Sequence, residues 1–182
     1  MRRTSHLVTA LGALAILVVG CSTAPPTATD KSQLHGDADA ALAAMKQKDP
    51  SLNDFLTNAY GYAIYPDIGK GAAGVGGAYG RGEVYEQNNR VGYTDMTQAT
   101  VGVSLGGQEY AELLVFQNKD TLDHFKAGNL EFAAQLSGVV VTAGGAASAK
   151  FQNGVAVFLD VKGGLMGEAS IGGQKFSYQP MQ

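Results

Sequence analysis

The sequence predicts an α+β domain with a mainly antiparallel, strongly coiled or barrel-like sheet, N-terminal helices before the sheet and one short helix inserted into it. Two observations predict this fold class. All but three of the 25 glycines lie between Gly61 and Gly173, where they alternate with short runs rich in Val, Tyr and Phe. This pattern is typical of antiparallel strands joined by turns. Before Gly61 the apolar residues recur instead at helical spacing.

Length, composition and charge fit one globular domain and exclude several classes of protein. The chain has 182 residues, of which 45% are hydrophobic, so it has the size of a single domain and is too apolar for disorder. Thirteen basic against sixteen acidic residues leave a net charge of −3, and no basic run follows the first three positions. We therefore expect no nucleic acid among its partners.

Residues 1–20 have the layout of an export signal. Arg2 and Arg3 give a positive start, and the uncharged stretch Leu7–Gly20 is shorter than the roughly 20 apolar residues that span a bilayer. Small residues then precede Cys21, a pattern that resembles the lipobox of bacterial lipoproteins. In such proteins the cysteine is diacylated and becomes the first residue of the mature chain. The alternative is an ordinary signal cleaved nearby, with Cys21 as an idle thiol.

The lipobox resemblance implies a lipid-anchored protein of the bacterial cell envelope. Ser22, directly after the cysteine, implies the outer membrane under the sorting rule usual for Gram-negative lipoproteins, with the domain facing the periplasm. Removal of residues 1–20 takes away two arginines and no acid, so the net charge changes from −3 to −5. Membrane residence then depends on the acyl chains, because each buried methylene contributes about 0.8 kcal/mol. The single cysteine excludes an internal disulfide.

Two helices are expected before the sheet. Residues 21–37 are rich in Ser, Thr, Pro and Asp without apolar periodicity, which predicts a flexible tether and places the domain at 38–182. The first helix ends before Pro50 and has an apolar face made of Leu34, Ala38, Leu42 and Met45. The second has Ser51 as N-cap, Asp54 in its first turn and an apolar stripe made of Leu52, Phe55, Leu56 and Ala59.

Turn residues and apolar runs place the strands. Asn88-Asn89 and Gly172-Gly173 each separate two strand patterns and predict hairpins, the second within a C-terminal meander. The runs Leu113–Phe116 and Val155–Leu159 are apolar at every position, so we expect both to be covered on both faces of the sheet.

One short helix interrupts the strands. Asp120 stands where an N-cap is needed, and Asp123 follows three residues later. Leu122 and Phe125 supply an apolar face, and Gly128 supplies the stop.

The segment Gly69–Gly74 matches GxGxxG, but the dinucleotide fingerprint requires a following helix, and the residues that follow have a strand pattern. We therefore expect no nucleotide cofactor.

Every second position from residue 72 to 82 is Gly or Ala, so one face of this strand is almost bare. Such a face admits another backbone, a helix or an acyl chain at close range, and the candidate contacts are Gly74, Gly76 and Gly80.

A second motif resembles a catalytic one. Gly102–Gly106 matches GxSxG, but the nucleophile elbow needs a turn and a helix after the serine, and Ser104 lies in a strand pattern. His124 is the single histidine of the expected domain, and its acidic neighbours on the same short helix are too near in sequence to build a triad with it. We expect no enzyme, no metal site and no cofactor. Paired carboxylates for glycoside chemistry stay open, because the fold sets their spacing.

Four blocks of sequence, in order, resemble the SYLF domain family, also called the Ysc84-type or DUF500 family. The first block runs from Ala63-Ile64-Tyr65-Pro66 through Lys70-Gly71 to Gly82, and the others occupy residues 99–108, 114–125 and 163–175. The resemblance covers residues 52–178. Ala72-Ala73 departs from the family, which often has a phenylalanine in that stretch, so a ligand contact from that aromatic does not carry over.

The resemblance implies association with membrane phospholipids. Eukaryotic members bind phosphoinositides and some bind actin, whereas bacterial members are exported lipoproteins. Actin is absent from a bacterial envelope, so we do not expect it as a partner. Phosphoinositide specificity does not carry over either, because residues 37–48 are near-neutral where eukaryotic members have a basic segment. The matching basic positions are Lys70, Arg81 and Lys175, which either contact phosphate or are solvated cations at strand ends.

The sequence thus predicts a membrane-anchored envelope lipoprotein whose SYLF-like domain binds phospholipid and has no catalytic activity. The alternative is a structural or protein-interaction module of the envelope without a lipid site. In that case the Gly/Ala face is internal packing, and the partner is another envelope protein.

Overall fold

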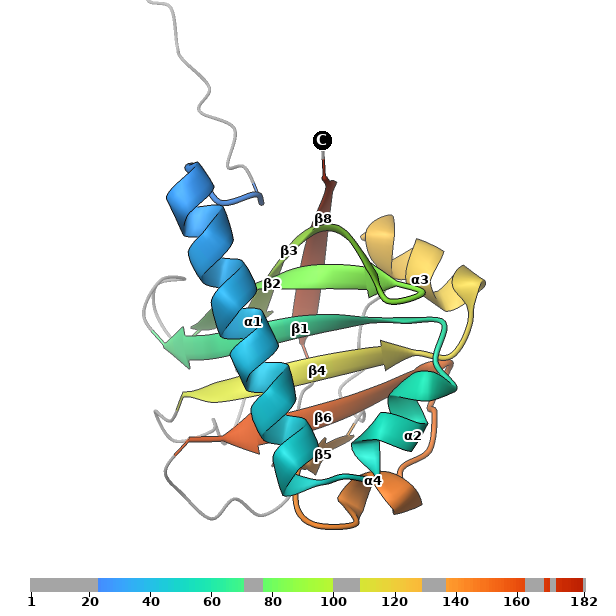
Figure 1. Cartoon of the computed structure of the whole chain (residues 1–182). Helices are drawn as coiled ribbons and strands as arrows, with labels where there is room; N and C mark the ends of the chain where they lie inside the picture. The colour runs from blue at the N-terminus through green and yellow to red at the C-terminus, as the bar shows by residue number, and fades with distance from the viewer. Residues whose placement is uncertain are drawn as a thin grey trace, which may run out of the picture.

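The computed structural model describes residues 23–70, 77–99, 109–128, 137–162, 169–170 and 173–181. In this part of the chain, helices pack on one large sheet (Figure 1). The helices are α1 (Ala28–Lys48), α2 (Leu52–Thr57), α3 (Lys119–Lys126) and α4 (Gly145–Ser148). The strands are β1 (Gly61–Lys70), β2 (Gly77–Glu86), β3 (Asn89–Ala99), β4 (Tyr110–Phe116), β5 (Ser137–Val140), β6 (Val155–Val161), β7 (Ala169–Ser170) and β8 (Gln174–Pro180).

The strands form a mixed sheet in the order β7-β5-β6-β4-β1-β2-β3-β8. Neighbouring strands are antiparallel except for β5 and β6, which are parallel. The predicted α+β class and the mainly antiparallel sheet are therefore confirmed. Within the described residues, β7 and β8 end the sheet on opposite sides and do not pair with each other, so the sheet is not a closed barrel.

The sheet coils strongly enough to bring β4 and β8 together across one of its faces. Three strands separate them in the sheet, yet Gln174 Nε2 of β8 donates a hydrogen bond of 2.8 Å to Glu112 Oε2 of β4. The Phe176 ring of β8 lies 5.3 Å from the Phe125 ring of α3 and 6.1 Å from the Tyr65 ring of β1. We call this concave side, covered by α3 and β8, the inner face.

Each face of the sheet has its own apolar core, because successive side chains of a strand point to opposite sides. Leu114 and Phe116 of β4 join the inner core with α3 and β8. Leu113 and Val115 join the core of the outer face, which α1 crosses diagonally in Figure 1. The two apolar runs in β4 and β6 are thus buried on both faces, as predicted.

Helix α1 begins at Ala28, so the flexible tether expected over 21–37 is wrong for residues 28–37. Thr27 starts the helix with a capping box: its Oγ1 accepts from the Asp30 N–H at 3.1 Å, and Asp30 Oδ2 accepts from the Thr27 N–H at 3.3 Å. Most residues of the first turns face solvent and are polar, so apolar spacing does not reveal this part of the helix.

Both predicted short helices form, with different caps. Ser51 precedes α2 but caps nothing, because its N–H and hydroxyl donate to Asp49 Oδ1 at 3.1 and 2.5 Å. Asn118 rather than Asp120 caps α3, since its Oδ1 accepts a backbone N–H of the first turn at 2.9 Å. Gly128 follows α3 with a φ of +71°, which confirms the expected stop.

One predicted hairpin forms and the other does not. The β2–β3 turn is made by Gln87 and Asn88, with φ of 48° and 64°, because Asn89 already pairs with Glu86 in the ladder. The C-terminal meander is wrong: β7 pairs with β5, whereas β8 pairs with β3 at the other end of the sheet. Pairing with β3 places Phe176 of β8 in the inner core.

Candidate functional site

Part of the predicted site lies outside the described residues. These positions are Cys21, Gly74 and Gly76, together with the serine of the GxSxG motif, Ser104. Lys70 ends β1 opposite Ala78 of β2, and only its backbone is described. The remaining predicted residues are fully described, and they are Gly80, Arg81 and Lys175.

The absence of a side chain at Gly80 lets strand β1 approach strand β2 closely. A Cβ built on it lies 2.6 Å from Ile68 Cγ1 and 3.2 Å from the Asp67 carbonyl oxygen, both in β1. The pairing of β1 with β2 shifts register between Ile64 and Ile68, so β1 bulges at this point. Strand β1 therefore fills the space beside Gly80. At this position the structure agrees with the alternative in which the Gly/Ala face is internal packing.

Arg81 and Lys175 lie on one face of the sheet, two strands apart. Arg81 stands opposite Asp95 in β3, which stands opposite Ser177 in β8, two residues from Lys175. Directly opposed side chains share a face, and neighbouring strands are about 4.8 Å apart. Arg81 Nε donates to Asp95 Oδ1 at 3.0 Å, so this cation is already paired. Lys175 is exposed and makes no ion pair within the described part of the chain.

The segment before α1 is fixed on the outer face of β8. Thr23 Oγ1 lies 3.2 Å from Ser177 Oγ, and the Ala24 N–H donates to Gln179 Oε1 at 3.0 Å. Ala24 and Pro25 are buried. From residue 24 back to residue 23 the contacts move along β8 from position 179 to 177.

Sequence reasoning missed a buried polar pair on the inner face. Glu112 and Gln174, joined by the 2.8 Å hydrogen bond, are 0% and 1% exposed. In the described structure, Oε1 of each of these residues has no hydrogen-bond partner. Tyr110 OH, on the same strand, donates to Gln98 Oε1 at 3.2 Å. The sequence signal was a single acid in β4, a strand otherwise suited to burial on both faces.

Burial raises the pKa of Glu112 to about 7 from an ordinary 4.5, while the hydrogen bond from Gln174 acts in the opposite direction. A substantial share of Glu112 is therefore protonated at neutral pH. The protonated acid has an O–H to donate, and Gln174 Oε1 is an acceptor without a partner among the described residues. The pair thus ties β4 to β8 most completely when Glu112 holds a proton.

A second buried acid holds α1 on the sheet. Glu83 is 0% exposed, and its Oε2 accepts from Tyr85 OH at 2.9 Å and lies 3.0 Å from His35 Nδ1 of α1. Its Oε1 accepts from Arg90 Nη1 at 2.7 Å. His35 Nε2 lies 3.6 Å from Asp39 on the next turn of α1. These contacts join α1, β2 and β3, so Glu83 has a structural role.

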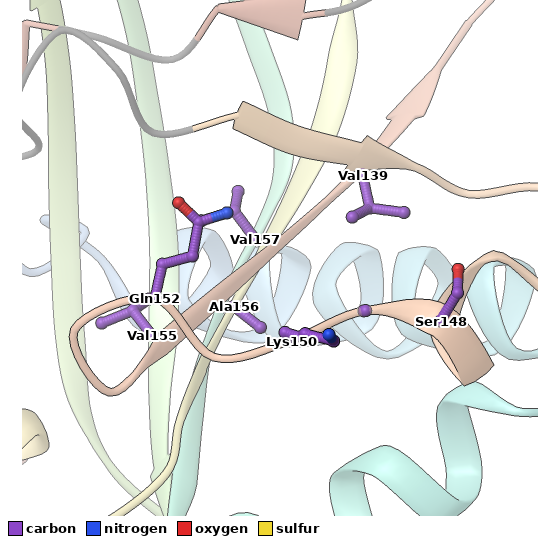
Figure 2. Close-up of a pocket in the computed structure, with 8 residues that line it drawn as sticks. Val139, Ser148, Lys150, Gln152, Val155, Ala156 and Val157 are labelled. Atoms are coloured by element: carbon purple, nitrogen blue, oxygen red, sulfur yellow. The ribbon is translucent and has the colours of Figure 1, made fainter.

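Two clefts flank α4, at the end of α1 far from Ala28 (Figure 1). The first, of about 260 Å³, lies among β5, the start of β6 and the segment after α4. Figure 2 shows Val139 of β5 across this cleft from Ser148 and Lys150. The second cleft, of about 390 Å³, lies between α2 and α4 and is lined by Phe55 and by small side chains of α4.

The described residues hold neither a metal-ligand cluster nor a spanning helix. No group of three or more His, Cys, Asp or Glu side chains among them has a geometry that could hold a metal ion. None of their helices combines the length and the apolar character needed to cross a membrane. His124 is exposed on α3, and its neighbour Asp123 is paired with Lys119 through a 2.5 Å hydrogen bond.

Comparison with known proteins gives one curated relative. No family model matches the chain. The chain is similar to beta cell expansion factor A of Aeromonas veronii. The two are 27% identical over 140 residues, which is 76% of this chain and 53% of the relative. The chain therefore spans about half the length of the curated relative it matches.

Proposed function

We propose that this chain is a lipid-anchored protein of the bacterial cell envelope, attached through acyl groups on Cys21, with a SYLF-like domain that contacts phospholipid and catalyses no reaction. The export signal, the lipobox-like residues before Cys21 and the four SYLF-like blocks support the proposal. The name of the relative from Aeromonas veronii describes an effect on beta cells and mentions neither lipid nor catalysis.

The lipobox-like residues before Cys21 carry the proposal, and the position of Thr23 shows how near to the domain such an anchor lies. Contacts with β8 hold Thr23 and Ala24 on the domain, so Cys21 is only two residues before the folded structure, with Ser22 between. Two residues reach at most about 7 Å even when fully extended. Acyl groups on Cys21 therefore place the domain itself against the headgroup layer.

The energy of attachment comes from the acyl chains rather than from the charge of the domain. Each buried methylene contributes about 0.8 kcal/mol, so two chains anchor stably. The mature chain carries −5 and is mildly repelled by an anionic surface. Phospholipid contact is then a local property of the surface beside the anchor.

The surroundings of the titratable groups support a non-catalytic domain. Asp123 is engaged with Lys119, so it does not orient the neighbouring His124. His35 contacts Glu83, but the other partners of this carboxylate are a tyrosine and an arginine that fix strands. A general base needs a nucleophile within hydrogen-bond reach, and the contacts of His35 serve the position of α1 instead.

A second candidate function is a protein-interaction module of the envelope. The two clefts beside α4 favour it, because both are concave and partly lined by apolar side chains. This candidate is compatible with the same anchor and differs in what the domain binds.

Metabolic labelling with an alkyne analogue of palmitate tests the proposal. The full-length chain, expressed in a Gram-negative bacterium, is expected to incorporate the label and to stay with the membrane fraction after a high-salt wash. The Cys21→Ser variant is expected to incorporate none. An unlabelled wild-type protein released into the periplasmic fraction contradicts the proposal.

A further inference from the structure

We infer that the outer face of β8, centred on Lys175, is the surface that contacts phospholipid headgroups, and that the α2–α4 end points away from the membrane. The inference rests on the proposed function, because it takes acylated Cys21 as the anchor. It adds an orientation and a contact residue, both argued from the contacts of Thr23 and Ala24 with β8 and from the short sequence distance between Cys21 and Thr23.

The reach of the chain limits where the acyl groups leave the domain. Cys21 lies within about 7 Å of Thr23, since each extended residue spans at most about 3.6 Å. Thr23 contacts Ser177. Lys175 lies two residues from Ser177 along β8, which is about 7 Å on the same face. The anchor therefore lies within about 20 Å of Lys175, on the side of the domain where Thr23 contacts β8.

The chemistry of the patch around Lys175 suits phosphate-bearing headgroups. The outward side chains of β8 beside the N-terminal segment are Lys175, Ser177 and Gln179, all of which have hydrogen-bond donors, and β8 contains no acid. Lys175 is exposed and has no ion-pair partner among the described residues. A lysine in this situation binds a phosphate as a point charge. Polar side chains fit the headgroup layer and not the acyl region.

A second unpaired cation lies close to the same patch. The Lys31 ammonium of α1 lies 5.8 Å from the centre of the Tyr93 ring, and Tyr93 stands opposite Gln179 in the sheet. In the part of the chain that the structure describes, Lys31 makes no ion pair. The patch thus has two cations within the width of a few strands, although the mature chain is acidic overall.

Helix α1 separates this patch from the clefts. Its 21 residues rise about 1.5 Å each, so its last turn lies about 30 Å from its first. Asp49 follows the helix and joins it to α4, because Asp49 Oδ2 accepts from the Ala146 N–H at 2.6 Å. With the first turn at the headgroup layer and α1 directed away from it, the clefts beside α4 lie on the aqueous side.

Photocrosslinking from two matched lysine positions tests the orientation. A photoreactive residue replaces either Lys175 or Lys150, an exposed lysine after α4, in the full-length chain. The acylated protein is purified and reconstituted into vesicles of phosphatidylethanolamine and phosphatidylglycerol. Its acyl mass is confirmed before irradiation. The expected result is crosslinked phospholipid from position 175 and none above background from position 150.

A spacer variant tests the short connection. Twelve Gly/Ser residues inserted between Ser22 and Thr23 add a chain with a mean span of about 20 Å, so labelling from position 175 should be lost. Unchanged labelling from 175 in the spacer variant contradicts the argument from chain reach. Labelling from 150, equal labelling from both positions, or none from either in a protein with its acyl mass overturns the orientation and leaves the anchor proposal standing. A protein without the acyl mass overturns both.

Discussion

Replacement of Glu112 by glutamine should stabilise the folded protein above neutral pH. The folded state raises the pKa of Glu112 to about 7 from 4.5, so it binds the proton more tightly than the unfolded state does. Between these two pH values the folded state holds more protons, and the free energy of unfolding falls as pH rises. The penalty is absent below pH 4.5 and complete above pH 7. Glutamine removes it, because the amide does not ionise.

The magnitude follows from the two pKa values. The difference between about 7 and 4.5, at roughly 1.4 kcal/mol per pH unit, corresponds to a penalty of about 3 kcal/mol for the ionised carboxylate. Glu112 is 0% exposed, so solvent screening does not reduce this value. Glutamine also keeps an acceptor for Gln174 Nε2 and adds a donor for Gln174 Oε1, which has no partner in the described structure.

Urea unfolding at a series of pH values between 4 and 8.5 measures this effect. Glu112→Gln and wild type are expected to have similar free energies of unfolding at the acid end. At the alkaline end the variant should be more stable by about 3 kcal/mol. Glu109→Gln, which changes an exposed acid next to the same strand, is the control and should leave the pH profile of the wild type unchanged.

Two results would contradict this prediction for Glu112→Gln. A variant that loses stability at pH 8 means that Glu112 is ionised and favourably bound in the folded protein. The second result concerns the difference in free energy of unfolding, wild type minus variant. If this difference does not fall between pH 4.5 and 7.5, Glu112 does not titrate in that range. Either result refutes the reasoning about the buried pair.

Three other expectations follow from the structure. Gly80→Val should destabilise the domain by about 1–3 kcal/mol, because its side chain meets β1; thermal unfolding checks it, and a variant as stable as wild type is incompatible with the packing described here. Asp49→Ala should cost about 3 kcal/mol or more in urea unfolding, since it strips the acceptor from the N–H groups of Ser51, Gly144 and Ala146; a loss under 1 kcal/mol argues against this role. Ser104→Ala and His124→Ala should leave any phenotype of the protein intact, and a serine-directed phosphonate bound to Ser104 would show otherwise.

Local patterns in the sequence predicted the elements that depend on nearby residues. The apolar runs in β4 and β6 indicated strands buried on both faces, and the apolar stripe of α3 with Gly128 after it indicated a short helix. The turn between β2 and β3 was predicted within one residue, because asparagine tolerates positive φ. These elements are fixed by the period of their own residues.

Contacts between distant residues explain what local patterns did not predict. The first turns of α1 are polar, and His35 meets Glu83 from 48 positions away. Glu112 and Gln174 are 62 positions apart and meet because the sheet coils. β7 and β8 follow each other in the chain but pair with strands at opposite ends of the sheet.

The candidate site was predicted in part. Lys175 was chosen by its match to a family pattern, but its place beside the N-terminal segment depends on the contact of Thr23 with Ser177, 154 positions away. Because residues 21–37 were expected to form a flexible tether, this contact was not predicted. Arg81 was chosen in the same way, and the structure pairs it with Asp95, a partner that β2–β3 register supplies.

The mass of the N-terminal peptide shows whether Cys21 is the first residue of the mature chain and carries the lipid. The protein is extracted from membranes with detergent, digested with protease and analysed by mass spectrometry. We expect a peptide that begins at Cys21 and carries a diacylglyceryl group on its sulfur. A mature protein that begins at another residue, with an unmodified Cys21 or none, contradicts this expectation.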